Sequence, residues 1–261
     1  MSMTEYTLSI GPERCFPVRS YSSVTSTNQL AKEAADGGAP EGLVILADHQ
    51  TAGRGRRTHS FYSPEHTGLY MSLLLRPNIP MQDCLLITTA AAASTARAIE
   101  ALTGQPARIK WVNDIFCASR KVCGILTEAT TVPGADRPNA VILGIGVNLA
   151  PPSGGFPPDI ENTAGALFPE LPSAQTRREL LQQILTEFWP YYQILQQKPF
   201  LEEYRRRSLV IGQPVRILQP GLDPENAVAV AVEDDFSLRV RLENGELRSL
   251  SSGDVSIRVR D

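Results

Sequence analysis

Short apolar runs separated by polar stretches characterise the first part of the chain. The runs at 43–47 and 68–75 predict buried strands, because each is too short for a helix and is bounded by polar residues. A further strand is predicted at 107–111. The runs at 122–130 and 140–149 predict two more core strands, joined by a connection rich in Pro and Gly. The pattern therefore indicates a sheet that is largely buried.

Two helices are predicted among these strands. Ser26 would cap the first helix, with Gln29 completing a capping box, and Gly37 and Gly38 would end it. The second helix covers 83–102, where the sequence is rich in alanine and almost uncharged. This mixed order of helices and strands predicts an α+β fold, in which helices lie against one face of a mixed or antiparallel sheet.

From Gly212 onward the periodicity changes. Before Gly212, a proline-rich connector at 150–175 is followed by two predicted helices that Pro190 separates. Short alternating runs then recur about every 8–12 residues, which is typical of a small all-β module such as an SH3-like barrel. We therefore expect two domains, a larger one at 1–208 and a small β-barrel at 209–261.

The composition excludes several classes of function. The chain is 42% hydrophobic and 20% charged, as in globular proteins, and its net charge of −3 does not favour a nucleic-acid-binding domain. It lacks an apolar run of about 18 residues and a secretory signal, so neither a membrane span nor secretion is expected. The spacings of the cysteines and histidines fit no familiar zinc pattern. A cytoplasmic location is the simplest expectation.

The polar loop at 48–66 contains an unusual motif, QTAGRGRR, at Gln50 to Arg57. Glycines let backbone N–H groups approach an anion closely, and arginines offer planar forks that fit carboxylate or phosphate. The motif is neither a P-loop nor a dinucleotide fingerprint. It predicts a mobile basic flap over a small anionic ligand, with a solvated loop or a weak nucleic-acid contact as the alternative.

A second motif, at 110–114, joins a lysine to a tight turn. Lys110 ends a predicted strand, and Asn113 and Asp114 follow it. Such a lysine could neutralise a phosphoryl group while the turn holds a nucleotide or a metal. The alternative is a surface lysine beside a core tryptophan and an Asx turn.

Three weaker motifs concern close approach and hydrogen bonding. Gly124 lies inside a predicted strand, which indicates either a ligand close to the backbone or a bulge. Gly144 and Gly146 precede Asn148 and leave room for a planar group or for tight packing on a helix. The segment 26–28 at a helix N-terminus suits a polar head group, although capping alone explains it.

These motifs also limit the chemistry. None offers a Ser-His-Asp arrangement or an activated cysteine. An enzyme built on them would act by positioning and charge stabilisation between bound substrates, as in phosphoryl or nucleotidyl transfer.

Taken together and in this order, the segments resemble the biotin–protein ligases, also called biotin–[acetyl-CoA-carboxylase] ligases. The resemblance covers about 24–149, and the tail from 212 is similar to the small β-barrel domain of that family. The matching motifs are Ser26-Thr27-Asn28, Gln50 to Arg56, Lys110-Trp111-x-Asn113-Asp114, Lys121-x-x-Gly124-Ile125-Leu126 and Gly144 to Asn148. The resemblance implies a catalytic domain with the class II synthetase-like fold.

The resemblance also implies two half-reactions. The biotin carboxylate attacks the α-phosphate of ATP, with Mg²⁺, and gives biotinyl-5′-adenylate and pyrophosphate. A lysine of a biotin carboxyl carrier protein, from acetyl-CoA carboxylase or a related carboxylase, then attacks the mixed anhydride. Mg²⁺ would be held through the ATP phosphates, with no protein ligand assigned. A homodimer is compatible with the resemblance, whereas DNA and membranes are not expected partners.

The roles of individual residues follow from the same resemblance. Lys110, Arg54 and Arg56 would be catalytic. The residues that would bind ATP are Arg54, Asn113, Lys121 and Asn148. The residues that would bind biotin are Ser26, Thr27, Asn28, Gln50, Gly53, Arg54, Gly55, Arg56, Lys110 and Gly124.

The chain departs from the family pattern at three positions. Thr58 stands where glycine is usual, which would stiffen the flap, Val112 replaces a proline in the turn, and Phe61 stands where tryptophan is common. Few residues precede Ser26, so we expect no winged helix-turn-helix and no DNA binding. Two alternatives stay open: a lipoate or octanoate ligase of the same broad fold, and a non-catalytic module that binds biotin or a nucleotide. The flap together with the lysine turn favours biotin.

Overall fold

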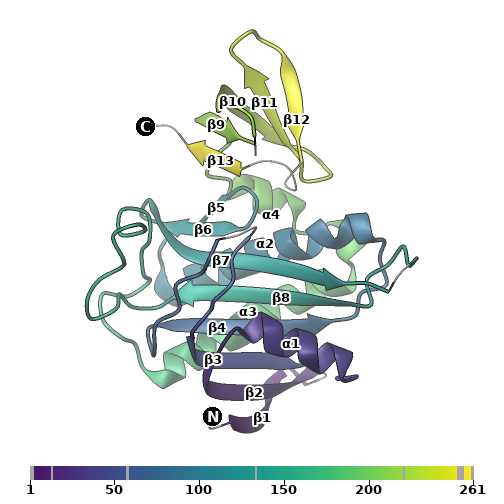
Figure 1. Cartoon of the computed structure of the whole chain (residues 1–261), viewed down its shortest axis with the longest axis vertical. Helices are drawn as coiled ribbons and strands as arrows, with labels where there is room; N and C mark the ends of the chain where they lie inside the picture. Colours follow the sequence, from purple (N-terminus) through teal and green to yellow (C-terminus); the bar gives the residue numbers. More distant parts are fainter. Residues whose placement is uncertain are drawn as a thin grey trace.

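A mixed sheet of eight strands forms the centre of the larger domain in the computed structural model (Figure 1). The structure describes residues 3–12, 14–56, 59–132, 134–219, 221–251 and 256–259. The strand order is β1-β2-β3-β4-β8-β7-β6-β5. The strands are β1 (Met3–Ile10), β2 (Arg14–Val24), β3 (Val44–Gln50), β4 (Gly68–Leu75), β5 (Arg108–Lys110), β6 (Asp114–Cys117), β7 (Arg120–Thr130) and β8 (Ala140–Asn148). Only β2 and β3 pair in parallel among these neighbours.

Both faces of the central strands are buried. The helices and 3₁₀ turns of this part are α1 (Thr27–Asp36), η1 (Met81–Cys84), α2 (Leu85–Thr103), α3 (Ala174–Gln193), η2 (Leu195–Gln197) and α4 (Leu201–Arg206). Ile45 and Leu74 pack with Ala31 of α1, whereas Val44 belongs to the core shared with α2 and α3. The α+β class with a mixed sheet is thus confirmed. The expectation that all helices lie on one face is wrong for α1, because β3 buries residues of both faces and each face needs a cover.

Helix α2 is a core helix. Together with η1 it spans Met81–Thr103, which is long and apolar enough to cross a membrane by length and composition. However, 72% of the most apolar 18-residue stretch of this segment is buried inside the protein. Its alanines lie against the sheet and against α3, where small side chains allow close packing.

Helix α3 runs through Pro190, so the predicted break at this residue is wrong. Proline removes one backbone hydrogen bond to the preceding turn, but only three residues of α3 follow it. Aromatic packing holds this end of the helix: the ring centroids of Trp189 lie 5.2 Å from those of both Phe16 and Tyr192. Phe16 lies on β2, which with β1 was not foreseen from the sequence.

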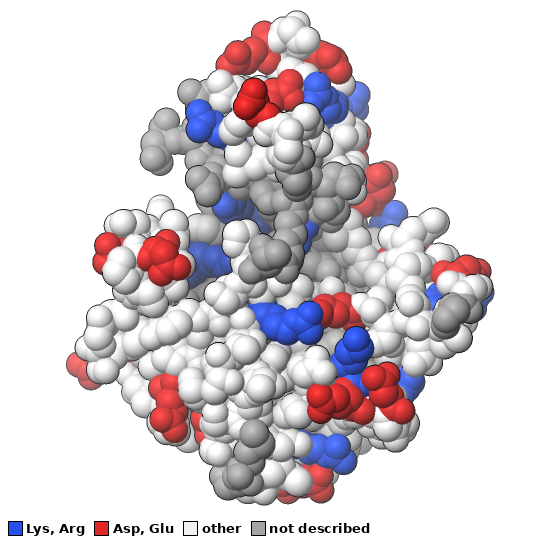
Figure 2. Space-filling view, viewed as in Figure 1, with Lys and Arg blue, Asp and Glu red and all other residues white. Residues whose placement is uncertain are grey.

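The C-terminal part forms a separate antiparallel sheet in the order β12-β11-β10-β9-β13. Its strands are β9 (Pro214–Leu218), β10 (Glu225–Val232), β11 (Leu238–Leu242), β12 (Leu247–Leu250) and β13 (Ser256–Val259). The expected small all-β domain is therefore present, and it stands above β5, β6 and α4 (Figure 1). Figure 2 shows basic side chains at the junction below it, beside acidic ones on the same face.

Candidate functional site

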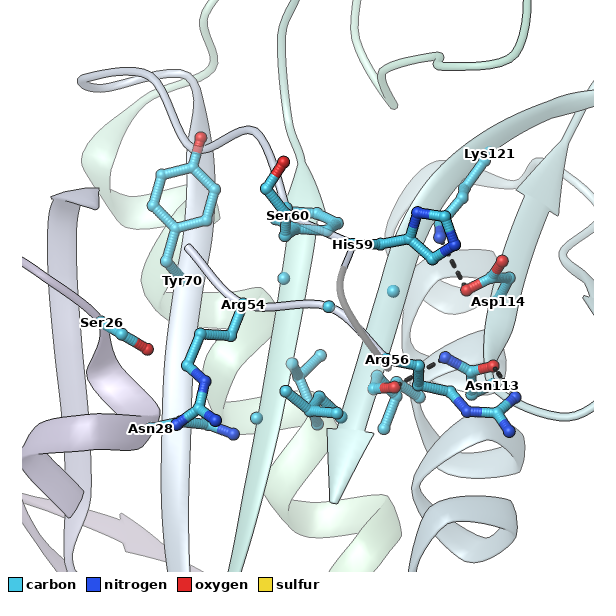
Figure 3. Close-up of a pocket in the computed structure, with 18 of the residues that line it drawn as sticks. Ser26, Asn28, Arg54, Arg56, His59, Ser60, Tyr70, Asn113, Asp114 and Lys121 are labelled. Atoms are coloured by element: carbon cyan, nitrogen blue, oxygen red, sulfur yellow. Dashed lines mark hydrogen bonds and ion pairs between the residues drawn. The ribbon is translucent and has the colours of Figure 1, made fainter. Parts of the chain in front are cut away.

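A cavity of about 290 Å³ opens where the N-terminus of α1, residues 50–56 and 59–61, the turn after β5 and the middle of β7 and β8 meet (Figure 3). Elements far apart in the sequence thus contribute to one site. The predicted site residues that line this cavity are Ser26, Thr27, Asn28, Gln50, Arg54, Gly55, Arg56, Lys110, Asn113, Lys121 and Gly124.

Polar groups at the start of α1 form one wall of the cavity. Ser26 is the N-cap residue, as predicted, but its side chain makes no capping hydrogen bond. The capping box is therefore wrong: the Gln29 side chain donates instead to Glu33 Oε1 at 2.9 Å. The first N–H of the helix, on Thr27, donates to Gln50 Oε1 at 2.9 Å, as does the Thr27 hydroxyl at 3.1 Å. Gln50 in turn donates to Ser63 Oγ at 2.8 Å. The buried hydroxyl of Ser26 is consequently not engaged in capping at the cavity wall.

A chain of hydrogen bonds connects this wall to the basic flap. The Ser72 hydroxyl, fully buried on β4, lies 2.5 Å from Asn28 Oδ1. Asn28 Nδ2 donates to Glu128 Oε2 at 2.8 Å, and Glu128 Oε1 pairs with Arg54 Nη2 at 2.8 Å. Figure 3 shows the Arg54 side chain extending towards Asn28. The orientation of Arg54 is therefore fixed from the sheet rather than from the flap itself.

Backbone hydrogen bonds connect residues 53–56 of the flap to residues 59–61. Gly55 N–H donates to His59 O at 2.8 Å, and Phe61 N–H donates to Gly53 O at 2.9 Å. A Cβ on Gly53 would collide with the Phe61 carbonyl oxygen and with Ser63 Oγ. Gly53 therefore serves this close backbone approach and does not line the cavity. Residues 57 and 58, including the Thr58 departure, lie outside the described residues.

Phe61 lies over Gly124 and Gly146, two of the three strand glycines that the sequence marked for close approach. A Cβ on Gly146 would lie 2.5 Å from Phe61 Cε1, and one on Gly124 would lie 3.1 Å from Phe61 Cε2. The ring also meets Tyr70 edge-on, with centroids 6.4 Å apart. The glycines thus provide a flat surface for a planar group, and an aromatic ring of the flap lies on it.

The turn after β5 forms the opposite wall. Arg56 Nη1 donates to Asn113 Oδ1 at 3.2 Å, and Asn113 Nδ2 donates to Ile125 O at 2.7 Å. Lys121 Nζ pairs with Asp114 Oδ1 at 2.7 Å (Figure 3). The second arginine of the flap is thereby connected to the lysine turn, so flap and turn form one side of the cavity.

Cations outnumber carboxylates around the cavity. Arg54, Arg56, Lys110 and Lys121 line it. Asp114 lines it as well, and Glu128 reaches Arg54 from β7. Lys110 Nζ lies 5.8 Å from the centroid of the Phe116 ring. This excess of positive charge suits an anionic ligand.

Asn148 is the other predicted site residue that does not line the cavity. Its Nδ2 donates to Gly165 O at 2.9 Å, and its carbonyl accepts from Leu167 N–H at 3.0 Å. Gly165 N–H donates in turn to Lys121 O at 2.8 Å. Asn148 therefore fastens the connector after β8 to the sheet, next to a lysine that does line the cavity.

Several site residues were missed from the sequence. Ser72 and Glu128 are polar residues in strands that are otherwise mostly apolar. Such a polar residue in an apolar run was the sequence feature that could have indicated a role near the site. Those two residues support the lining residues from behind, whereas Tyr70 lines the cavity itself, and burial raises the pKa of Tyr70 to about 12. Its hydroxyl donates to Pro64 O at 3.0 Å, which holds the loop after the flap.

Metal binding by protein side chains alone finds no support in the part of the chain that the structure describes. No group of three or more His, Cys, Asp or Glu side chains there could hold a metal ion. The two carboxylates closest to the cavity, Asp114 and Glu128, are each paired with a basic side chain.

Family models match most of the two sheet-containing parts. Residues 20–148 match the biotin/lipoate A/B protein ligase family, and residues 210–258 match the biotin protein ligase C-terminal domain. Both ranges contain residues that line the cavity: the first range contains those from Ser26 to Gly146, and the second contains Leu218 of β9.

Curated relatives and solved structures agree with these matches. The bifunctional ligase/repressor BirA of Bacillus spizizenii is 40% identical over 169 residues, which are 65% of this chain and 51% of that protein. The chain thus spans about half the length of this relative. The biotin–[acetyl-CoA-carboxylase] ligase of Mycobacterium tuberculosis is 30% identical over 240 residues, covering 88% of this chain and 85% of that protein. A biotin protein ligase from Aquifex aeolicus, solved in complex with biotin and ATP, superposes with a TM-score of 0.76 at 25% identity, covering 93% and 99% of the two chains.

Proposed function

The chain belongs to the family of biotin–[acetyl-CoA-carboxylase] ligases, and we propose on this basis that it is an ATP-dependent biotin–protein ligase. In the first half-reaction, a carboxylate oxygen of biotin forms a bond to the α-phosphorus of ATP and pyrophosphate leaves. In the second, the amine of a carrier lysine attacks the acyl carbon, an amide bond forms and AMP leaves.

The observation that carries this proposal is the convergence of Arg54, Arg56 and Lys110 on one cavity. A carboxylate and a triphosphate repel each other, and the repulsion is strongest where water is excluded. Cations fixed in advance reduce this repulsion and stabilise the charge that develops at the α-phosphate. The cavity supplies them together with polar groups that suit an uncharged head group.

The roles of the lining residues follow from their positions. Ser26, Thr27, Asn28 and Gln50 would bind the ureido head group of biotin, because they supply donors and acceptors at one wall and the first three are buried. Arg54, Gly55 and Arg56 would cover biotin and the adenylate. A ring of the ligand would lie against Gly124, where the Phe61 ring lies in this structure. This arrangement would keep water from the reactive anhydride.

The nucleotide would lie towards the opposite wall. Lys110 would contact the biotin carboxylate and the α-phosphate, and Asn113 and Lys121 would serve the nucleotide. Asn148 would act indirectly, through the connector that it holds beside Lys121. Mg²⁺ would enter with ATP as part of the substrate, since the carboxylates described near the cavity are engaged with basic side chains.

The acceptor would be the biotin carrier domain of a carboxylase, and the reaction would take place in the cytoplasm. Free thiols at all four cysteines are consistent with a reducing compartment. Lipoate or octanoate ligation is the competing function, because the matched family model covers both kinds of ligase. The polar wall favours biotin, since the hydrocarbon tail of octanoate offers no partner for those groups.

Release of pyrophosphate from ATP tests this proposal. We expect release that depends on biotin, followed by transfer of label from biotin to a lysine of a purified carrier domain. Release that depends on lipoate or octanoate instead of biotin would contradict the substrate assignment. Binding of biotin without any release would favour a non-catalytic module.

A further inference from the structure

Two hydrogen bonds to residues outside the cavity hold the turn that carries Lys110, one from the Trp111 side chain, which also lines the cavity, and one to the Val112 backbone. The Trp111 indole donates from Nε1 to the Phe236 carbonyl oxygen at 2.9 Å. The Tyr204 hydroxyl donates to the Val112 carbonyl oxygen at 3.0 Å. Since Trp111 and Val112 directly follow Lys110, both hydrogen bonds restrain the residues next to the lysine.

Phe236 lies in the turn between β10 and β11 of the C-terminal domain, and its environment is unusual for such a turn. Residues at hairpin turns are commonly exposed, yet Phe236 has an exposed fraction of 0%. Its φ of 65° lies in the left-handed region, which bulky residues rarely adopt. Such a conformation persists only where the surroundings enforce it, and it is enriched at functional sites.

The surroundings of Phe236 come from the helices below it. Its ring stacks on Phe200 with centroids 5.5 Å apart and meets Tyr204 edge-on at 5.3 Å. Arg205 Nε donates to Val232 O at 2.9 Å, which holds the end of β10 against α4. The same α4 therefore supplies the Tyr204 hydroxyl to the lysine turn and the binding surface to the β10–β11 turn.

The far side of the lysine turn is fixed separately. Asn113 Nδ2 donates to Ile125 O, and Ile125 N–H donates to Asn113 O at 3.0 Å. The turn is thus held by β7 at one end and by α4 and the small domain at the other. Displacement of a catalytic group by about 1 Å can reduce a rate about a hundredfold, so restraint of this kind has a direct use at Lys110.

We propose that Tyr204 and the β10–β11 turn are positioning elements that hold Lys110 for the first half-reaction. The C-terminal domain then contributes to adenylate formation through the backbone of the lysine turn. This inference rests on the proposed ligase function. Tyr204 and Phe236 themselves are positioning residues, because they act on the lysine through Trp111 and Val112.

The variant Tyr204→Phe tests the inference, because it removes one hydroxyl and keeps the buried ring. We expect kcat for biotin-dependent pyrophosphate release to fall about tenfold, while the Kd for biotin, measured by calorimetry, changes by less than about twofold. The matched control is Tyr192→Phe, which removes a hydroxyl that donates to Glu41 Oε1 at 2.5 Å and lies away from the cavity. This control should keep kcat near the wild-type value.

Hydrogen–deuterium exchange of the peptide that covers 108–117 provides a readout independent of activity. We expect faster exchange in Tyr204→Phe than in wild type and in Tyr192→Phe. If Tyr204→Phe does not fold, Trp111→Phe removes the other hydrogen bond and should also speed the exchange of this peptide; because Trp111 lines the cavity, this variant is judged by exchange alone. An unchanged exchange rate, or an equal loss of kcat in both tyrosine variants, would overturn the inference. A wild-type protein that releases no pyrophosphate with biotin would instead refute the ligase function. Hydrogen–deuterium exchange of the 108–117 peptide would still show whether Tyr204 holds the turn.

Discussion

Arg54 and Glu128 form an ion pair beside the candidate cavity, with 2.8 Å between Nη2 and Oε1. The same carboxylate accepts a hydrogen bond from Asn28 on the opposite side. Glu128 therefore links the flap to the wall that would bind the head group of biotin. An anionic ligand that enters this cavity meets a guanidinium already oriented by an internal carboxylate.

Replacing Glu128 with Gln removes this charge and keeps an acceptor for Asn28. We expect the KM for biotin to rise about fivefold, because Arg54 loses the contact that orients it. The free energy of unfolding should change by at most about 1 kcal/mol, since the pair is partly exposed. Steady-state pyrophosphate release and thermal unfolding measure these quantities. Glu5→Gln, which breaks the exposed pair with Arg19, is the control, and an equal KM in both variants would refute this role.

Arg56 connects the flap to the lysine turn through Asn113. Without this contact the flap should open more often, so Arg56→Ala should release biotinyl adenylate into solution about tenfold faster than wild type. Thin-layer chromatography of reactions with α-labelled ATP measures the released adenylate. Arg19→Ala, at an exposed strand, should behave as wild type. Retention of the adenylate by Arg56→Ala would count against a closing flap.

The strand glycines provide a test of the flat surface under Phe61. A methyl group at Gly146 would lie 2.5 Å from Phe61 Cε1 and displace the ring. We expect Gly146→Ala to lower kcat/KM about tenfold and the free energy of unfolding by about 1 to 3 kcal/mol. Gly154→Ala is a suitable control, because no atom lies within 4 Å of the added Cβ. Equal behaviour of the two variants in kinetics and denaturant unfolding would contradict the packing described.

The ion pairs around Arg207 predict how stability depends on pH. Arg207 is buried and donates to Glu203 Oε1 at 2.6 Å and to Glu100 Oε2 at 2.5 Å. Burial raises the pKa of Glu203, but hydrogen bonds from Arg207 and Arg206 outweigh it, so the pKa lies below its ordinary value. This stabilisation is present above the unfolded pKa of about 4.3 and is lost as the pH falls through the lower folded value.

Glu203→Gln should therefore destabilise the protein by about 1 to 2 kcal/mol at pH 7, because Arg207 loses one charged acceptor and keeps its pair with Glu100. The difference from wild type should shrink as the pH falls below about 4. Urea unfolding across this pH range measures both effects. A difference that stays constant with pH would show that Glu203 does not contribute through its charge.

Much of the site could be predicted from the sequence because its motifs carry residue types with few structural uses. Arginines between glycines predicted a basic flap over an anionic ligand, and the family resemblance joined this flap to the lysine turn; the structure brings Arg54, Arg56 and Lys110 to one cavity. Strand periodicity similarly located β3, β4, β7 and β8. These features depend on local patterns, which one sequence contains in full.

The parts that were missed depend on tertiary contacts. The Ser26 side chain makes no capping bond, and the first N–H of the helix, on Thr27, donates to Gln50, which is distant in sequence and which the local capping rule does not consider. Pro190 was expected to end a helix, but aromatic packing around Trp189 retains the last turn. The hydrogen bond from Trp111 to Phe236 joins residues 125 positions apart, and no local pattern indicates it.

The central claim is that fixed cations allow a carboxylate and a triphosphate to approach each other. Lys110→Met keeps most of the side-chain length and removes its charge, so it tests this claim most directly. We expect kcat for biotin-dependent pyrophosphate release to fall at least about a hundredfold, while calorimetry shows a Kd for biotin within about tenfold of wild type. A variant that keeps kcat within about threefold of wild type would contradict the account.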